Sequence, residues 1–277
     1  MFLPLHFCKI GRTIFSCENL ISHWPIVLVS PHEVDVRERS FCVKLKKGIL
    51  LHNFLVIGHR GASGYEPENT IRSFKKALEL GCSWIELDVH LVEDQIVVIH
   101  DDDLSRTTNG RGSVSTSCFK YLRSLDAGKG EQIPTLQEVL DLVGQQCSVN
   151  IELKGTGTAR AVSTLLRKRS SNRDQFLVSS FKHTELVQTD PHFRRGAIWD
   201  QRIKSLVSKT LELSAEAIVV EHSLVSVSLV EESQGANLKI FVYTINEPPD
   251  VREMVRLGVD GIFTDFPNQA ILFPKSL

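Results

Sequence analysis

Short apolar, β-branched runs alternate with longer stretches of helical periodicity from Phe54 onward. This alternation is typical of repeated βα units that build a parallel sheet. In the helical stretch Asn69–Leu80, for example, Ile71, Phe74 and Leu78 form an apolar stripe. The runs that read as strands are Leu55–Gly58, Trp84–Leu91, Gln95–His100, Val149–Lys154, Phe176–Ser180, Gly196–Trp199, Ala217–Glu221, Lys239–Thr244 and Asp260–Thr264.

These nine runs are one more than the eight strands of a TIM-type (β/α)8 barrel. The residues between Leu91 and Gln95 are too few for a crossover helix. The pattern therefore predicts an α/β barrel with one strand outside the ring, and it leaves open which strand that is. An open doubly wound sheet is the alternative, but Gly58-x-x-Gly61-x-x-Gly64 has the wrong spacing for a dinucleotide fingerprint.

The first 54 residues lack this alternation of strand-like and helix-like runs. They carry seven Lys+Arg against four Asp+Glu. We expect an N-terminal extension over 1–54, poorly ordered or with a mis-assigned start, a barrel domain over 55–272 and a C-terminal tail over 273–277. Because Met1 and Met254 are the only methionines, one hypothesis is a true start near Leu50 at a non-Met codon. An intact mass near 31.1 kDa would contradict it.

Composition excludes several classes of protein. A formal net charge of −1 argues against nucleic-acid binding, which needs clustered Lys and Arg. The apolar stretch Leu20–Val29 is interrupted by His23 and Pro25 and is too short for an integral membrane segment. The six cysteines form no C-x-x-C pair, and no complete signal peptide is recognisable, so we expect reduced thiols and a cytoplasmic location.

Acidic side chains share one face of a predicted strand. Glu86 and Asp88 point to the same side because alternate residues of a strand share a face. A half-exposed strand with a solvated acidic face would also give this pair. Glu152 and Lys154 repeat the arrangement in a later strand, and charged residues in strands buried on both faces are costly unless paired or liganded. The repetition favours a functional site.

The three carboxylates Glu86, Asp88 and Glu152 lie toward the C-terminal ends of two predicted strands, where barrel active sites are found. Oxygen ligands without a thiolate suit a hard divalent cation, Mg²⁺ or Ca²⁺. Lys154 either adds positive charge for an anion held by that metal or forms a plain ion pair with a neighbouring acid.

Two histidines also follow predicted strands. His59 comes directly after the first strand and His100 ends the third, and both precede polar loops. This placement is typical of a general acid and a general base around one reacting group, although a lone histidine after a strand is usually structural. Arg60 offers a donor fork for phosphate oxygens, and the glycines around it would let the backbone approach closely. His90 is a further candidate on the face of Glu86.

Eight ordered segments at comparable spacing resemble the glycerophosphodiester phosphodiesterase family, in particular its compact, cytosolic bacterial-type members. They are HRGASGYEPENT (His59–Thr70), ELDVHLVED (Glu86–Asp94), VVIHDDDLSRTTNGRG (Val97–Gly112), IPTLQEVL (Ile133–Leu140), NIELK (Asn150–Lys154), VSSF (Val178–Phe181), VYTIN (Val242–Asn246) and GVDGIFTDFP (Gly258–Pro267).

The resemblance implies a metal-dependent barrel hydrolase of lipid and glycerol metabolism. Its small-molecule substrates would be glycerophosphodiesters, such as glycerophosphocholine or glycerophosphoethanolamine, cleaved to sn-glycerol 3-phosphate and an alcohol. The implied roles are one divalent cation, Mg²⁺ or Ca²⁺, on Glu86, Asp88 and Glu152, acid/base catalysis by His59 and His100, phosphate contacts from Arg60 and Lys154, and an aromatic wall against the glycerol from Tyr243, where the family often has Trp.

Two other functions remain open at this point. One is a lysophospholipase D-type phosphodiesterase acting on lysophospholipids, which would need an apolar channel or a membrane-facing patch. The other is a non-catalytic phosphodiester-binding barrel, which would not need both histidines. The sequence shows no heptad or interface signature, so it leaves the oligomeric state open.

Overall fold

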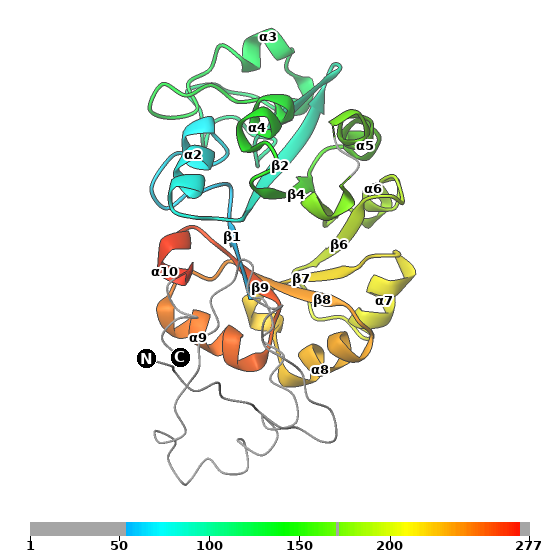
Figure 1. The fold of residues 1–277 in the computed structure, drawn as a ribbon. Coiled ribbons are helices and arrows are strands. Elements are labelled where there is room, and N and C mark those ends of the chain that lie inside the picture. The colour runs from blue at the N-terminus through cyan, green and yellow to red at the C-terminus, as the bar shows by residue number, and fades with distance from the viewer. Residues whose placement is uncertain (1–53, 170–171, 272–277) are drawn as a thin grey trace, which may run out of the picture. The chain divides into compact units, whose positions relative to one another are not determined.

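A computed structural model describes residues 54–169 and 172–271 of the chain (Figure 1). The expectations for residues 1–53 and for the tail at 273–277 lie outside the described residues. The barrel expected from the sequence falls within them.

Eight parallel strands close into a ring, which confirms the predicted TIM-type barrel. Each strand pairs in parallel with the next, and β1 pairs with both β2 and β9, which closes the sheet on itself. The ring consists of β1 (Leu55–Gly58), β2 (Trp84–Val92), β4 (Ser148–Leu153), β5 (Phe176–Ser180), β6 (Arg194–Trp199), β7 (Ala217–Glu221), β8 (Lys239–Tyr243) and β9 (Gly261–Thr264).

The strand outside the ring is β3 (Gln95–Val98), which runs antiparallel to β2. The connection between them begins at Glu93, whose φ of 54° lies in the left-handed region. So short a connection can only turn the chain back as a hairpin, because a parallel crossover needs a dozen or more residues. The structure thereby settles which of the nine predicted strands does not belong to the barrel.

Helices follow the strands and lie outside the ring (Figure 1). The helix expected at 69–80 is α2 (Ile71–Glu79), and the hydroxyl of Thr70 caps it by accepting from the N–H of Ser73. The other helical elements are η3 (Val114–Thr116), α3 (Phe119–Leu122), α4 (Leu136–Val143), α5 (Thr158–Arg169), η4 (Arg173–Gln175), α6 (His183–Leu186), α7 (Leu206–Glu212), η5 (His222–Leu224), α8 (Val227–Gly235), α9 (Pro248–Leu257) and α10 (Pro267–Ile271).

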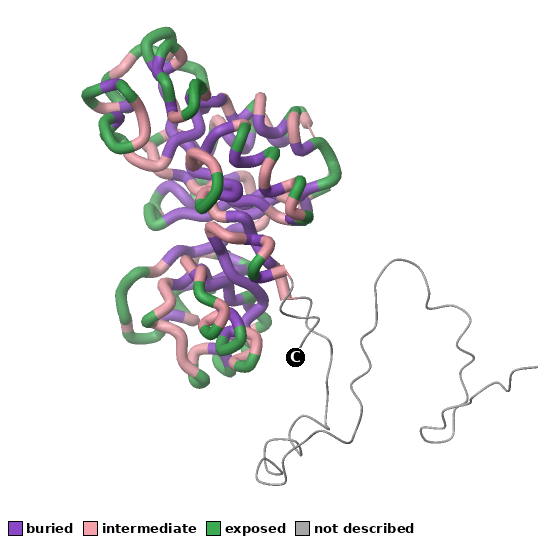
Figure 2. Tube along the Cα trace, turned by 90° about the vertical axis from the view of Figure 1, so that its left-hand side faces the viewer, coloured by how far each residue is buried: buried purple, intermediate pink, exposed green. Residues whose placement is uncertain are grey.

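The two faces of β2 have different environments. Ile85, Leu87 and Val89 are fully buried in the apolar layer shared with the surrounding helices. Glu86 and Asp88 alternate with them and are also buried, so they face the inside of the ring. Buried residues gather along the inside of the trace, whereas exposed residues lie mainly at its outer turns (Figure 2). The predicted acidic face is therefore the inner face of the barrel.

Among the described residues, none of the helices has both the length and the apolar character needed to cross a membrane.

Candidate active site

A cavity of about 280 Å³ opens inside the ring, where the strands end. Its polar walls come from the segments after β1 and β3 and from β2 and β4, and its apolar walls come mainly from β5 through β9. The residues around it are His59, Arg60, Glu86, His100, Asn150, Glu152, Phe181, Ile198, Val219, Tyr243, Thr244 and Phe263.

Three carboxylates lie together at this cavity, and two of them, Glu86 and Glu152, line it. Asp88 lies directly beside Glu152 in the parallel register of β2 and β4. One oxygen from each of Glu86, Asp88 and Glu152 lies within 4.8 Å of the other two. Glu86 is 2% exposed and Asp88 is 1% exposed, which rules out a solvated acidic face for this strand.

Each of the two buried carboxylates uses one oxygen for the protein. Glu86 Oε2 accepts from the backbone N–H of Arg60 at 2.8 Å, and Asp88 Oδ2 accepts from the side-chain amide of Asn69 at 2.8 Å. Glu86 Oε1 and Asp88 Oδ1 have no hydrogen-bond partner among the described residues. Buried carboxylate oxygens without a partner are costly, and a divalent cation with oxygen ligands would satisfy them. The donor set therefore fits such a cation.

The pKa shifts of the three carboxylates also favour a bound cation. Burial raises the pKa of Glu86 well above its ordinary value, and the charges of Asp88 and Glu152 raise it further. Burial and the charge of Asp88 raise the pKa of Glu152 to about 7. Burial alone would also raise the pKa of Asp88, but Arg60 and Lys154 outweigh it and hold that pKa below the usual range. The cluster therefore needs additional positive charge for all three groups to ionise together.

Arg60 and Lys154 supply positive charge on either side of Asp88. Arg60 Nε lies 3.4 Å from Asp88 Oδ2, and its Nη1 donates to Glu68 Oε1 at 2.7 Å. Lys154 Nζ donates to Glu152 Oε1 at 2.8 Å and lies 3.8 Å from Asp88 Oδ1. The structure shows the ion pair of Lys154 with a neighbouring acid, and a contact of Lys154 with an anion stays a prediction.

His100 lies between Lys154 and a second carboxylate. Its Nε2 is 3.1 Å from Lys154 Nζ, and its Nδ1 is 2.5 Å from Asp101 Oδ1. Asp101 in turn pairs with Arg106, which also donates to Glu68. Burial is the main cause that lowers the pKa of His100, and the positive charges of Arg60 and Lys154 lower it too, against the opposing effects of Asp88 and Asp101. The structure therefore favours a neutral imidazole at His100.

His59 contacts a carboxylate that the sequence analysis did not assign. Its Nδ1 lies 2.7 Å from Asp265 Oδ1, although the two residues are 206 positions apart. Asp265 belongs to the segment GVDGIFTDFP and Asp101 to the segment VVIHDDD, so both lie in recognised motifs. Sequence reasoning gave them no role because neither lies on a strand face with the other candidates.

Tyr243 ends β8 and lines the cavity, as expected. Its ring meets the ring of Phe181 edge to face at a centroid distance of 6.1 Å, and its hydroxyl donates to the carbonyl oxygen of Trp199 at 3.2 Å. The pair forms part of the apolar wall of the cavity. His90 is not part of the cavity lining, and its Nε2 lies 3.1 Å from the carbonyl oxygen of His100, so it supports the loop that carries this residue.

The glycines that follow Arg60 lie close to other parts of the protein. Gly61 has a φ of 88°, and a Cβ there would come within 2.4 Å of Ser73 Oγ. A Cβ on Gly64 would come within 2.3 Å of the Phe266 ring. Close approach to neighbouring protein atoms therefore explains these glycines.

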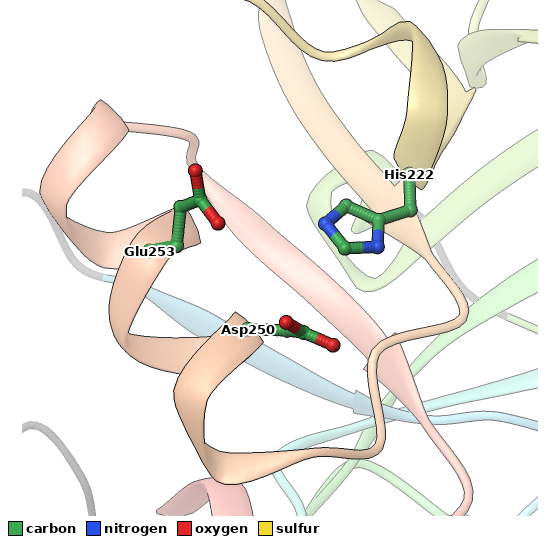
Figure 3. Close-up of side chains that lie close together, drawn as sticks. All are labelled: His222, Asp250 and Glu253. Atoms are coloured by element: carbon green, nitrogen blue, oxygen red, sulfur yellow. The ribbon is translucent and has the colours of Figure 1, made fainter.

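A second group of ligand side chains consists of His222, Asp250 and Glu253, from η5 and α9 (Figure 3). One ligand atom of each lies within 4.8 Å of the other two. His222 and Asp250 are partly exposed and Glu253 is exposed, so water can satisfy their polar atoms. The buried group at Glu86, Asp88 and Glu152 lacks that alternative.

Comparisons with known proteins agree with this geometry. Residues 59–269 match the sequence model of the glycerophosphoryl diester phosphodiesterase family. A glycerophosphodiester phosphodiesterase of Caldanaerobacter subterraneus is 37% identical over 233 residues, which cover 78% of this chain and 96% of that protein.

Solved structures show the same relationship. A phosphodiesterase of Oleispira antarctica in complex with the product sn-glycerol-3-phosphate superimposes with a TM-score of 0.75 at 31% identity, covering 78% of this chain and 95% of the other. A glycerophosphodiester phosphodiesterase of Thermotoga maritima gives a TM-score of 0.70 at 29% identity, covering 80% and 98%. Because the family's sequence model spans most of the chain, including the whole cavity lining, this chain belongs to the glycerophosphoryl diester phosphodiesterase family.

Proposed function

We propose that this phosphoric diester hydrolase cleaves glycerophosphodiesters, such as glycerophosphocholine and glycerophosphoethanolamine, to sn-glycerol 3-phosphate and an alcohol. Three lines support the proposal: the family to which the chain belongs, the product named for the Oleispira antarctica relative, and the composition of the cavity. The polar walls suit a phosphate, and the wall of Phe181 and Tyr243 suits the carbon side of a glycerol.

Glu86, Asp88 and Glu152 would hold one divalent cation, Mg²⁺ or Ca²⁺. The observation that supports this assignment is the pair of buried carboxylate oxygens, Glu86 Oε1 and Asp88 Oδ1, that lack a partner among the described residues. When bound, such a cation polarises a phosphate oxygen and lowers the pKa of a bound water or hydroxyl group.

Arg60 and Lys154 would bind the phosphate of the substrate. Both lie beside the carboxylates that the cation would neutralise, so their positive charge becomes available to an anion. The guanidinium group can donate to two phosphate oxygens at once, and Lys154 adds a point charge. Together they stabilise the negative charge that develops on the phosphate oxygens in the transition state.

The two histidines would move protons. In this scheme one imidazole accepts the proton of the attacking hydroxyl as its oxygen forms a bond with phosphorus. Attack by water gives sn-glycerol 3-phosphate directly, whereas attack by the glycerol 2-hydroxyl gives a cyclic phosphate that water opens in a second step. The other imidazole donates a proton to the alcohol oxygen as its bond to phosphorus breaks. His59 and His100 both line the cavity, each with its Nδ1 held by a carboxylate, so Nε2 is the nitrogen that would transfer the proton, once Lys154 has released that of His100.

The proposal rests on two histidines, two carboxylates and Arg60 that line one cavity, with Asp88 and Lys154 in direct contact with this set. A coupled dehydrogenase assay for sn-glycerol 3-phosphate tests it with glycerophosphocholine, and an assay for released choline tests lysophosphatidylcholine, each with Mg²⁺, Ca²⁺ or EDTA. We expect glycerol 3-phosphate release from glycerophosphocholine that depends on the cation. Choline release from lysophosphatidylcholine alone would favour the lysophospholipase D alternative, and no cation-dependent product from either would favour a binding barrel. The expected cytoplasmic location stays a prediction.

A further inference from the structure

Asp265 occupies the position directly after β9, where three donors from different parts of the chain meet it. His59 Nδ1 and the hydroxyl of Ser63 both contact its Oδ1 at 2.7 Å. The side-chain amide of Asn246 donates to its Oδ2 at 2.7 Å. Both oxygens of this carboxylate therefore have protein partners, in contrast to those of Glu86 and Asp88.

The position of Asp265 is itself fixed. Asn246 Oδ1 accepts from the backbone N–H of Asp265 at 2.9 Å and from the hydroxyl of Thr264 at 3.1 Å. Asp265 and Asn246 thus bind each other through both side chain and backbone, which ties the segment after β8 to the segment after β9. Because several hydrogen bonds would break together, the carboxylate cannot turn away from His59 at low cost.

This contact determines which nitrogen of His59 faces the cavity. A carboxylate only accepts, so the proton of a neutral His59 lies on Nδ1 and its Nε2 is left as the acceptor. When Nε2 takes up a proton, the same carboxylate stabilises the resulting imidazolium, as the buried aspartate does in serine proteases. The geometry therefore provides both orientation and charge stabilisation.

The two carboxylates that contact the catalytic histidines differ in their other partners. Asp101, at His100, is also paired with the guanidinium of Arg106, which compensates its charge. The remaining partners of Asp265 are the neutral side chains of Ser63 and Asn246. The negative charge of Asp265 is thus directed mainly at His59. Burial opposes ionisation of Asp265, but the hydrogen bond from His59 and its other donors lower its pKa to about 2.

We propose that Asp265 is the positioning residue for His59, holding the imidazole with Nδ1 protonated and Nε2 directed at the reacting oxygen, and stabilising the imidazolium during proton transfer. This inference rests on the proposed catalytic role of His59. Ser63 and Asn246 contribute by holding the carboxylate in place.

A double-mutant cycle tests the proposal in the full-length protein. Asp265→Asn replaces an acceptor by an amide of the same size, and we expect it to lower kcat for glycerophosphocholine by about 10²-fold with KM little changed. His59→Ala should lower kcat at least as much. If Asp265 acts through His59, the double variant should be no slower than His59→Ala alone. Asp190→Asn is a matched control, because Asp190 is also paired with a side chain, Arg167, but lies outside the cavity lining.

The kinetic outcomes separate the two proposals. If His59→Ala leaves kcat unchanged, the proposed function of the histidine fails. If His59→Ala lowers kcat but Asp265→Asn does not, the positioning role alone is wrong. If the loss of kcat in the double variant equals the product of the two single-variant losses, the positioning role is also wrong, since a residue that merely supports the fold acts independently of His59.

A spectroscopic measurement tests the same contact without turnover. In ¹⁵N NMR spectra at a pH where the imidazole is neutral, His59 should show a protonated Nδ1 and an unprotonated Nε2. Asp265→Asn should change this tautomer signal while leaving the thermal unfolding midpoint close to that of the Asp190→Asn control. An unchanged tautomer signal would contradict the assignment, whatever the kinetics.

Discussion

Lys154 and His100 contact each other directly, with 3.1 Å between Nζ and Nε2. An ammonium group only donates, so His100 Nε2 accepts and its own proton lies on Nδ1, toward Asp101. Lys154 also donates to Glu152. If the proposed cation binds Glu152 and the phosphate draws Lys154 toward itself, Lys154 would move away from both Glu152 and His100. The same movement would free Nε2 of His100 for proton transfer.

Replacing Lys154 tests whether its ammonium group binds the phosphate of the substrate. We expect Lys154→Gln to lower kcat/KM for glycerophosphocholine by about 10²-fold, because the variant loses one charge-assisted phosphate contact of roughly 2–3 kcal/mol. Lys168→Gln, at an exposed position near the end of α5, is the matched control and should leave kcat/KM unchanged. Steady-state kinetics measure both. Equal values for the two variants would argue against a phosphate contact at Lys154.

Each cavity histidine should contribute strongly to turnover. We expect His59→Ala and His100→Ala to reduce kcat by roughly 10² to 10⁴-fold, because each removes a proton-transfer group. His192→Ala, whose ring packs against Phe193 away from the cavity, serves as the control. The coupled assay under saturating substrate measures the loss. Near-wild-type turnover in both cavity variants would refute the acid/base assignment.

Removal of a buried carboxylate should abolish cation binding. Adding Mg²⁺ or Ca²⁺ to EDTA-treated protein should raise the unfolding midpoint, since a cation that binds only the folded state stabilises it by mass action. The shift should disappear in Glu86→Gln and in Asp88→Asn, and it should persist in Glu232→Gln, where the exposed acid lies on α8. A cation-dependent shift of equal size in all three variants would place the cation elsewhere.

The pair of His59 and Asp265 should also affect stability at low pH. The pKa of Asp265 is about 2 in the folded protein, below the ordinary 3.8. A depressed pKa contributes stability that is fully present above the unfolded pKa and is lost as the pH falls through the folded pKa. The stability difference between wild type and Asp265→Asn should therefore be constant above about pH 4.5 and shrink toward pH 2. Urea titrations between pH 3 and 6 measure it, and a difference that grows on acidification would contradict the pairing.

Cys82 and Cys147 should resist thiol reagents in the native protein. Burial raises the pKa of both thiols to about 12, so almost no thiolate forms at pH 8. Cys118 is exposed and should react rapidly. Peptide mapping after brief treatment with an alkylating reagent measures each site separately, and labelling in denaturant is the positive control. Equal rates at Cys82 and Cys118 would show that the barrel opens readily around α2 and β2.

The sequence by itself determined the class of fold and predicted most of the residues that the structure brings together at the cavity. Alternation of strand-like and helix-like runs specified βα units, and the i, i+2 spacing placed Glu86 and Asp88 on one face of a strand. Local patterns suffice for such features because side-chain direction in a strand follows from a period of two residues. The ordered motifs then identified the family, which the comparisons confirmed.

Tertiary structure decided what depends on pairing between distant segments. Ring closure by β1 with β2 and β9 made the acidic face of β2 the inner one and left β3 outside. It also brought Asp265 to His59 across 206 positions, a contact that no local pattern encodes. The two-residue period of a strand assigns each side chain to one of two faces, but it does not say which face lies inside the barrel. That depends on which strands pair with one another across the whole chain.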